Sequence, residues 1–156
     1  MDNIGKAKAI ISKIRYITLA TVAQDGKPWN APVFSAYDEN YNFYWGSHRE
    51  SQHSKNIRAA GHVFLVIYDS TVAAGQGEGV YIEAAAAALE DPEKIMHAHQ
   101  LLEVRHQPAS YWKLEQVQGS APIRLYKAVP EKVWMNGEGE VNGHYIDTRV
   151  EVGLLS

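Results

Sequence analysis

One short segment, Trp45–Ile57, holds most of the side chains that could carry chemistry in this sequence. It contains three serines, two histidines, an arginine and a lysine, and it lies between a predicted strand end and the start of a predicted helix. Exposed backbone amides at a helix N-terminus favour a phosphate group. The pattern therefore predicts an anion site, and the neighbouring Tyr44 and Trp45 suit a flat ring attached to that anion. The plain alternative is a polar loop followed by a capped surface helix.

A second candidate lies near the C-terminus. Trp134 precedes a glycine-rich hairpin, and Arg149 lies in the last predicted strand, where polar and apolar residues alternate. An arginine opposite a tryptophan can flank a flat anionic ring system by stacking and hydrogen bonding. An exposed strand face would give the same alternation, so both interpretations stay open.

The remaining motifs indicate little chemistry. The glycines between Gly75 and Gly79 do not match a phosphate-binding loop and favour a flexible loop. His97 and His99 point apart on a helix, and His99 and His106 lie two turns apart, so we predict no metal site. Neither a Ser-His-Asp arrangement nor a G-x-S-x-G motif is present, which leaves hydrolase chemistry without support.

Composition restricts the class of protein. The 156 residues predict one domain, residues 1–156, and the 46% hydrophobic and 21% charged content is that of an ordinary globular chain. A formal net charge of −3 gives no bias toward nucleic acid or an anionic membrane. The absence of cysteine excludes disulfides and thiolate chemistry. With no secretory pattern at the N-terminus and no long apolar run, we predict a cytoplasmic protein without nucleic-acid or membrane partners.

The elements that position these residues are mostly strands. Apolar spacing and capping residues predict helices from about 4 to 15, over 51–60 and over 91–106, and a further helical piece over 108–117. Strands are predicted over 16–23, 29–37, 42–45, 62–68, 123–129, 132–135 and 145–152, with turns at Asn136-Gly137 and Asn142-Gly143. The alanine-rich segment 81–89 fits either a helix or a strand. Adjacent strands in runs favour a mainly β (α+β) antiparallel barrel of six to seven strands with two to four flanking helices.

The order of these elements resembles the pyridoxamine 5′-phosphate oxidase-like family of FMN-binding split β-barrel proteins. The resemblance covers about residues 14–154 and is strongest at Ser51-Gln52-His53-Ser54-Lys55-Asn56-Ile57, which is similar to the phosphate loop of that family. Other matching segments are Leu19-Ala20-Thr21-Val22, Asp25-Gly26-Lys27-Pro28, Ala31-Pro32-Val33, Phe43-Tyr44-Trp45-Gly46-Ser47 and the strand from Val63 to Asp69.

This resemblance implies a homodimer with FMN at the subunit interface, and it implies a barrel strand for the alanine tract. It assigns residues to the isoalloxazine ring, the ribityl chain, the phosphate and the partner-chain side of the site. In that order these are Pro32, Val33 and Phe34 along the ring; Trp45, Gly46 and Ser47 at the ring and ribityl chain; Ser51, Gln52 and His53 at the phosphate; and Trp134 and Arg149 from the partner chain.

Departures from the family pattern affect the expected activity. Gln52 and His53 occupy the places of an Arg-Lys pair in genuine pyridoxamine phosphate oxidases, and Asn30 and Ser35 occupy those of an arginine and a lysine. We therefore expect an FMN-dependent oxidoreductase with an unknown small-molecule substrate rather than a pyridoxal phosphate synthase. The alternatives are a non-catalytic flavin-binding, storage or stress-response module, and a deazaflavin- or haem-binding relative. The resemblance names no catalytic acid or base.

Overall fold

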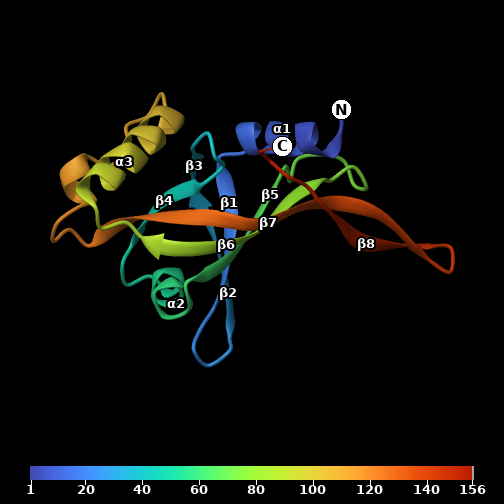
Figure 1. Cartoon of the computed structure of the whole chain (residues 1–156), viewed down its shortest axis with the longest axis horizontal. Coiled ribbons are helices and arrows are strands. Elements are labelled where there is room, and N and C mark those ends of the chain that lie inside the picture. The colour runs from blue at the N-terminus through green and yellow to red at the C-terminus, as the bar shows by residue number, and fades with distance from the viewer. Residues whose placement is uncertain (156) are drawn as a thin grey trace.

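A computed structural model describes residues 1–155 (Figure 1). Their eight strands form one antiparallel sheet with the order β2-β1-β5-β6-β7-β4-β3, and β8 pairs with β7. The strands are β1 (Tyr16–Val22), β2 (Pro28–Phe34), β3 (Ala36–Tyr37), β4 (Phe43–His48), β5 (His62–Tyr68), β6 (Gly79–Ala88), β7 (Ile123–Val141) and β8 (His144–Glu151). The helices are α1 (Asn3–Lys13), α2 (Gln52–Ala60) and α3 (Pro92–His106), with a 3₁₀ turn at Leu114–Gln116.

The helix ends follow from local capping chemistry. The Asp2 carboxylate accepts a hydrogen bond from the Gly5 amide, and the Asp91 carboxylate accepts bonds from the second and third amides of α3, which begins at Pro92. Helix α2 ends at Gly61, whose φ of 74° is the left-handed conformation that glycine adopts without steric cost. These caps confirm the helix positions predicted from the sequence.

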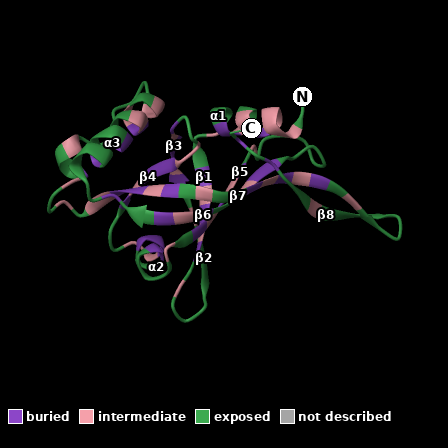
Figure 2. Ribbon diagram, in the orientation of Figure 1, coloured by how far each residue is buried: buried purple, intermediate pink, exposed green. Residues whose placement is uncertain are grey.

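Two hydrophobic clusters hold the fold together. The larger one fills the barrel and includes Trp45 and Leu65, both fully buried, and α1 closes one end of it. The smaller one lies on the other face of β4, where Tyr44 packs with Leu102 of α3. Figure 2 shows the buried residues along the strands and α2, and the exposed hairpin of β7 and β8 that extends beyond the barrel. Strand β4 therefore contacts a core on each of its faces.

Strand β7 corrects the sequence prediction, which had placed two strands here, residues 123–129 and 132–135, followed by a turn. It is continuous from Ile123 to Val141, and the predicted turn at Asn136-Gly137 lies inside it, paired with β8. A register shift opposite Glu83 and Ala84 accommodates Pro130, which has no amide to donate to a regular ladder. The turn at Asn142-Gly143 is confirmed, and both residues have positive φ.

The segment that follows α3 is the other difference. Residues 108–117 were predicted to be helical, but only Leu114–Gln116 form a 3₁₀ turn. The preceding residues cross the outer face of β4, where their aromatic rings find more apolar contact than an isolated helical turn would offer. The alanine tract is strand β6, as the family resemblance implied. Within residues 1–155, no helix combines the length and apolar character needed to span a membrane.

Candidate functional site

The predicted phosphate loop lies where β4 gives way to α2. Ser51 is the N-cap residue of α2, but its side chain makes no hydrogen bond to the first amides of the helix. Its hydroxyl donates instead to the His48 carbonyl oxygen at 2.8 Å and lies 2.8 Å from the Ser54 hydroxyl. The first-turn amides therefore keep their hydrogen-bonding capacity for a ligand, which is the usual property of an anion site at a helix N-terminus.

His53 connects this helix to β4 through its ring nitrogen. Its Nε2 atom lies 2.8 Å from the Ser47 hydroxyl and 3.2 Å from the Ser51 hydroxyl. Burial lowers the pKa of His53, so the ring is neutral at physiological pH. The histidine that was predicted to contact a phosphate thus acts through two hydroxyl groups rather than as a positive charge.

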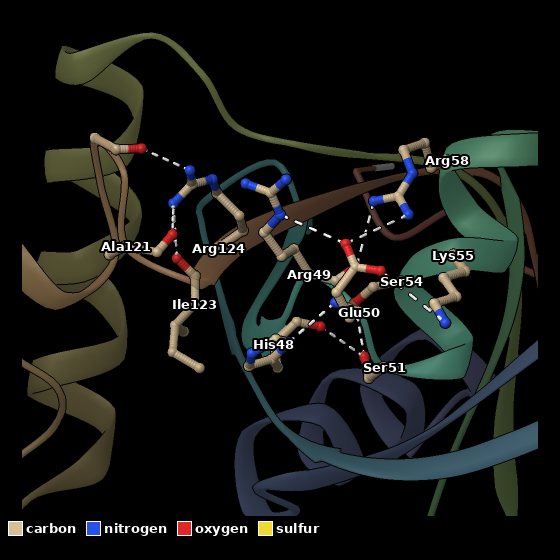
Figure 3. Close-up of polar contacts among 11 residues, drawn as sticks. His48, Arg49, Glu50, Ser51, Ser54, Lys55, Arg58, Ala121, Ile123 and Arg124 are labelled. Carbon is tan, nitrogen blue, oxygen red and sulfur yellow. Dashed lines mark hydrogen bonds and ion pairs between the residues drawn. The ribbon is translucent and has the colours of Figure 1, made fainter.

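Positive charge near the loop comes from its outer side. Arg49, Lys55 and Arg58 surround Glu50, with nitrogen–oxygen distances of 3.5, 4.0 and 3.9 Å (Figure 3). All four side chains are about half exposed, so each ion pair contributes little stability. Three cations against one carboxylate still leave the entrance to α2 locally positive, which favours an approaching anion.

Three other polar residues of this region, Arg124, Gln52 and Asn56, are hydrogen-bonded to other groups of the protein. Figure 3 shows the Arg124 guanidinium turned toward backbone carbonyl oxygens, which include those of Ala121 and Ile123. The Gln52 amide donates to the Asn56 side-chain oxygen at 2.8 Å, and Asn56 in turn donates to the Thr21 hydroxyl at 2.9 Å. Gln52 and Asn56 therefore attach α2 to β1 through a buried amide network.

Of the three β4 residues predicted at the ring and ribityl chain, Trp45 and Gly46 face opposite sides of the strand. The Trp45 side chain is fully buried in the barrel and stacks on Tyr126, with ring centroids 5.7 Å apart. Gly46 faces outward, and the rings of Tyr111 and Trp112 pack directly against it. Its amide donates to the Tyr111 hydroxyl, and burial raises the pKa of that tyrosine. The Trp45 ring is therefore part of the core, whereas Gly46 lies at the wall of an external cavity.

That cavity, of about 400 Å³, adjoins the predicted ring-binding part of β2. Its lining residues are Tyr16, Phe34, Gly46, His106, Ser110, Tyr111, Trp112 and Gln116. Phe34 packs edge-on against His106 at 4.9 Å, whereas Pro32 is exposed and Val33 is buried in the barrel. Among the three predicted residues of β2, Phe34 alone lines the cavity.

The sequence interpretation missed the part of this cavity that α3 and the following segment provide. His106, Tyr111 and Trp112 had been assigned to helices or left without a role. The available signal was the adjacent Tyr111-Trp112 pair shortly after Pro108, since two large aromatics in a segment without regular structure need a surface to cover.

The two C-terminal candidates lie close to each other, outside the loop at the N-terminus of α2. The Arg149 guanidinium carbon lies 4.0 Å from the ring centroid of Tyr81 and 5.3 Å from that of Phe64, which stacks with Trp134. In Figure 1, α2 and β8 lie at opposite ends of β7. One chain therefore brings together Trp134 and Arg149, and separately the loop residues, but it does not join the two groups.

The histidines of α3 have other contacts. His99 hydrogen-bonds through Nε2 to the Trp112 carbonyl oxygen, and His97 packs edge-on against Tyr44. In the portion of the chain that the structure describes, no three His, Asp or Glu side chains gather in a metal-binding arrangement.

The architecture defines a split β-barrel protein, and the loop at the N-terminus of α2 is its candidate anion site. Residues 4–137 match the family model of pyridoxamine 5′-phosphate oxidase, and the chain belongs to that family. No protein of curated function matches this chain in sequence.

Several solved structures share the fold. A candidate 5-nitroimidazole antibiotic resistance protein from Bacteroides thetaiotaomicron has a TM-score of 0.71 at 12% identity, with 86% of this chain and 84% of that chain covered. The haem storage protein HutZ from Vibrio cholerae has a TM-score of 0.69 at 18% identity, covering 84% and 92%. A FAD-binding protein from Mesorhizobium loti has a TM-score of 0.63 at 18% identity, covering 86% and 94%. At these identities the likeness concerns the fold.

Proposed function

We propose that this protein is an FMN-binding flavoprotein and an oxidoreductase acting on a small molecule. The observation that carries the proposal is the loop at the N-terminus of α2, where the Ser51 hydroxyl leaves the helix amides open and the cations at Arg49, Lys55 and Arg58 stand at the entrance. Membership of the pyridoxamine 5′-phosphate oxidase family supports flavin as the ligand. Bound FMN would supply the hydride chemistry, and the protein would supply position and charge.

The residues present fit a phosphomonoester with modest charge assistance. The amides of the first turn of α2 are suitable donors to phosphate oxygens. The Ser51 hydroxyl donates its hydrogen to the His48 carbonyl oxygen, and the buried Ser47 hydroxyl is hydrogen-bonded to neutral His53, so these side chains hold the loop in the shape that presents the amides. Gln52 is bonded to Asn56, so it serves as a support for the helix rather than as a direct contact. The ring would then extend from this loop toward Phe34 and Gly46.

The complete site requires a second copy of the chain in this proposal. Trp134 lies in β7 and Arg149 in β8, outside the loop that joins β4 to α2, yet both belong to the predicted flavin contacts. In a homodimer, the exposed face that carries them would meet the loop of the partner. Dilution below the dimer dissociation constant should then release flavin, and a monomer that retains FMN fully would contradict the shared site.

The visible spectrum of the purified protein, followed by FMN and riboflavin titrations, tests the proposal. We expect the double variant Ser51→Ala/His53→Ala to lose at least tenfold in FMN affinity, since charge-assisted hydrogen bonds to phosphate are worth about 1.5–3 kcal/mol each. Riboflavin affinity should change little because riboflavin has no phosphate. The matched control is Ser70→Ala/His62→Ala, at exposed positions outside the loop. Equal losses for both ligands, or no flavin binding at all, would refute the assignment.

A haem-binding function is the second candidate. The observation that favours it is His106, whose imidazole lies at the wall of the cavity and has a buried Nδ1 atom without a hydrogen-bond partner. A histidine is a common axial ligand of haem iron. Haem addition should then produce a Soret band that His106→Ala abolishes and His62→Ala preserves. A band that persists in His106→Ala would exclude this ligand assignment.

The cytoplasmic location remains a prediction from the sequence.

A further inference from the structure

The lining of the cavity next to Gly46 contains no fixed charge. Four of its residues are Tyr16, Phe34, Tyr111 and Trp112, and its polar groups come from Ser110, Gln116 and His106. No carboxylate, lysine or arginine contributes to it. Its volume of about 400 Å³ lies in the range of small-molecule sites. The aromatic rings offer a flat molecule surfaces for stacking, and no fixed charge is present in the lining to pair with an ion.

The nearby arginines are directed elsewhere. Arg105 precedes His106 in the chain, but its guanidinium donates to the carbonyl oxygens of Ile11 and Ile14 at 2.9 and 2.8 Å. Arg15 donates to the Gln107 carbonyl oxygen at 3.2 Å. Because both side chains are held by backbone oxygens outside the cavity lining, neither is placed to neutralise a charged ligand inside it.

The aromatic wall is fixed from two sides. Residues 108–113, called the strap below, carry Tyr111 and Trp112 across β4. The Tyr111 hydroxyl accepts the Gly46 amide hydrogen, and the Trp112 carbonyl oxygen is hydrogen-bonded to His99 of α3. Strand β3 pairs with β4 only at Phe43 and Tyr44, so the strap covers a part of β4 that β3 does not reach. The wall is therefore built into the fold rather than a free loop.

We propose that this cavity binds an uncharged, planar aromatic molecule as the substrate of the flavin site, with the Trp112 and Tyr111 rings as its wall. The inference rests on the proposed function, because Phe34 and Gly46 belong both to the cavity and to the predicted flavin contacts. The flavin ring would lie on the β2 side, and the substrate would lie between that ring and the strap. Selection against charge follows from the lining, since it supplies no fixed charge and an ion that loses water on entering gains no ion pair in return.

Two naphthalene probes of equal ring size test the preference for neutral ligands. Binding of 2-naphthol and of naphthalene-2-sulfonate is measured by isothermal titration calorimetry at pH 7, with the FMN-loaded and the flavin-free protein. We expect 2-naphthol to bind the FMN-loaded protein at least tenfold more tightly than the sulfonate, a difference of about 1.4 kcal/mol, because the lining offers the sulfonate no cation. Trp112→Ala should weaken 2-naphthol at least fivefold.

A charge placed at the cavity provides the sharper test. Ser110 lines the cavity and is exposed, so Ser110→Arg should improve sulfonate binding and remove most of the preference. Ser70→Arg, which adds the same charge in the turn after β5, should leave the preference unchanged. Equal affinity of both probes for the wild type, or the same response in both arginine variants, would overturn the proposal.

The flavin titrations separate this inference from the proposed function. If FMN binds but excludes 2-naphthol, the cavity is the slot of the flavin ring, and the substrate-pocket assignment is wrong. If FMN does not bind and 2-naphthol still depends on Trp112, the proposed function fails and the aromatic site stands without it. Circular dichroism of each variant confirms that the fold is intact.

Discussion

Gly46 is the position where one methyl group has the clearest structural consequence. A Cβ atom there would lie 2.4 Å from Cζ3 of Trp112 and 2.5 Å from the Tyr111 hydroxyl oxygen. Ordinary van der Waals contact begins at about 3.4 Å, so both rings would have to withdraw by about 1 Å. The strap is anchored to β4 through the Gly46 amide itself, which leaves it little freedom to move away without losing that bond.

We therefore expect Gly46→Ala to reduce the free energy of unfolding by about 1–3 kcal/mol, the usual cost of overpacking. For a chain of this length, each kcal/mol corresponds to about 2–4 °C in Tm, so the expected decrease is about 2–12 °C. Urea unfolding followed by circular dichroism measures the free energy, and tryptophan fluorescence reports whether Trp112 becomes more exposed.

A double-mutant cycle with Trp112→Ala tests the cause. Removing the indole should relieve much of the clash, so adding Gly46→Ala in that background should cost less than half as much, with a coupling energy of about 0.5–2 kcal/mol. Glycine is slightly less favourable than alanine within a strand, and this general effect lowers the cost of Gly46→Ala equally in both backgrounds. Equal costs of Gly46→Ala in the two backgrounds would refute the packing of Trp112 on β4.

Three further predictions concern groups that position the site. Burial would raise the pKa of Asp38, but hydrogen bonds from Asn42, Tyr44 and the Asn40 amide outweigh it, so the pKa is lowered in the folded state. The ionised carboxylate therefore stabilises the fold. This contribution is complete above the unfolded pKa of about 3.9 and is lost as the pH falls through the lower folded value. Asp38→Asn should therefore be less stable than the wild type at pH 7, with a difference that shrinks below about pH 4 in urea titrations; a constant difference would contradict this. Asn56→Ala should cost about 1–3 kcal/mol, because the Thr21 hydroxyl loses a buried donor, and thermal unfolding that matches the wild type would argue against it. Gly61→Ala should cost about 1–2 kcal/mol, because φ at that position is 74°, and an unchanged midpoint in urea would exclude the strain.

Much of the barrel could be predicted because its signals are local. The β-rich composition of β1, the apolar run of β5, the Asp91-Pro92 cap and the Asn142-Gly143 turn each involve a few neighbouring residues, and the predicted elements are confirmed. The burial of β5 on both faces that the apolar run indicated is wrong, since its burial alternates along the strand. The full length of strand β7 was harder to predict from the sequence. Asn136-Gly137 is a frequent turn pair, but pairing with both β6 and β8 stabilises the extended conformation there, and no local pattern reveals those partners.

The site was predictable to the extent that it depends on sequence order. The position of Ser51 and His53 at the start of α2 could be predicted because a strand end, a polar segment and a helix cap follow one another in the chain. The contribution of Trp112 could not be found in this way, since its contact with Gly46 joins residues from two distant segments. The opposite directions of Trp45 and Gly46 follow from strand alternation, but which direction faces the core depends on the partner strand.

Fixed charges are distributed unevenly between the loop at the N-terminus of α2 and the cavity beside Gly46. Around the loop, the fixed cations Arg49, Lys55 and Arg58 stay at the surface, and the interior contacts are the hydroxyls of serines held by neutral His53. The cavity beyond Gly46 continues without any fixed charge. A ligand that satisfies both regions carries its anionic group at one end and an uncharged flat body at the other. FMN has this form, and a neutral aromatic substrate placed beside its ring would extend the same division of polarity into the strap.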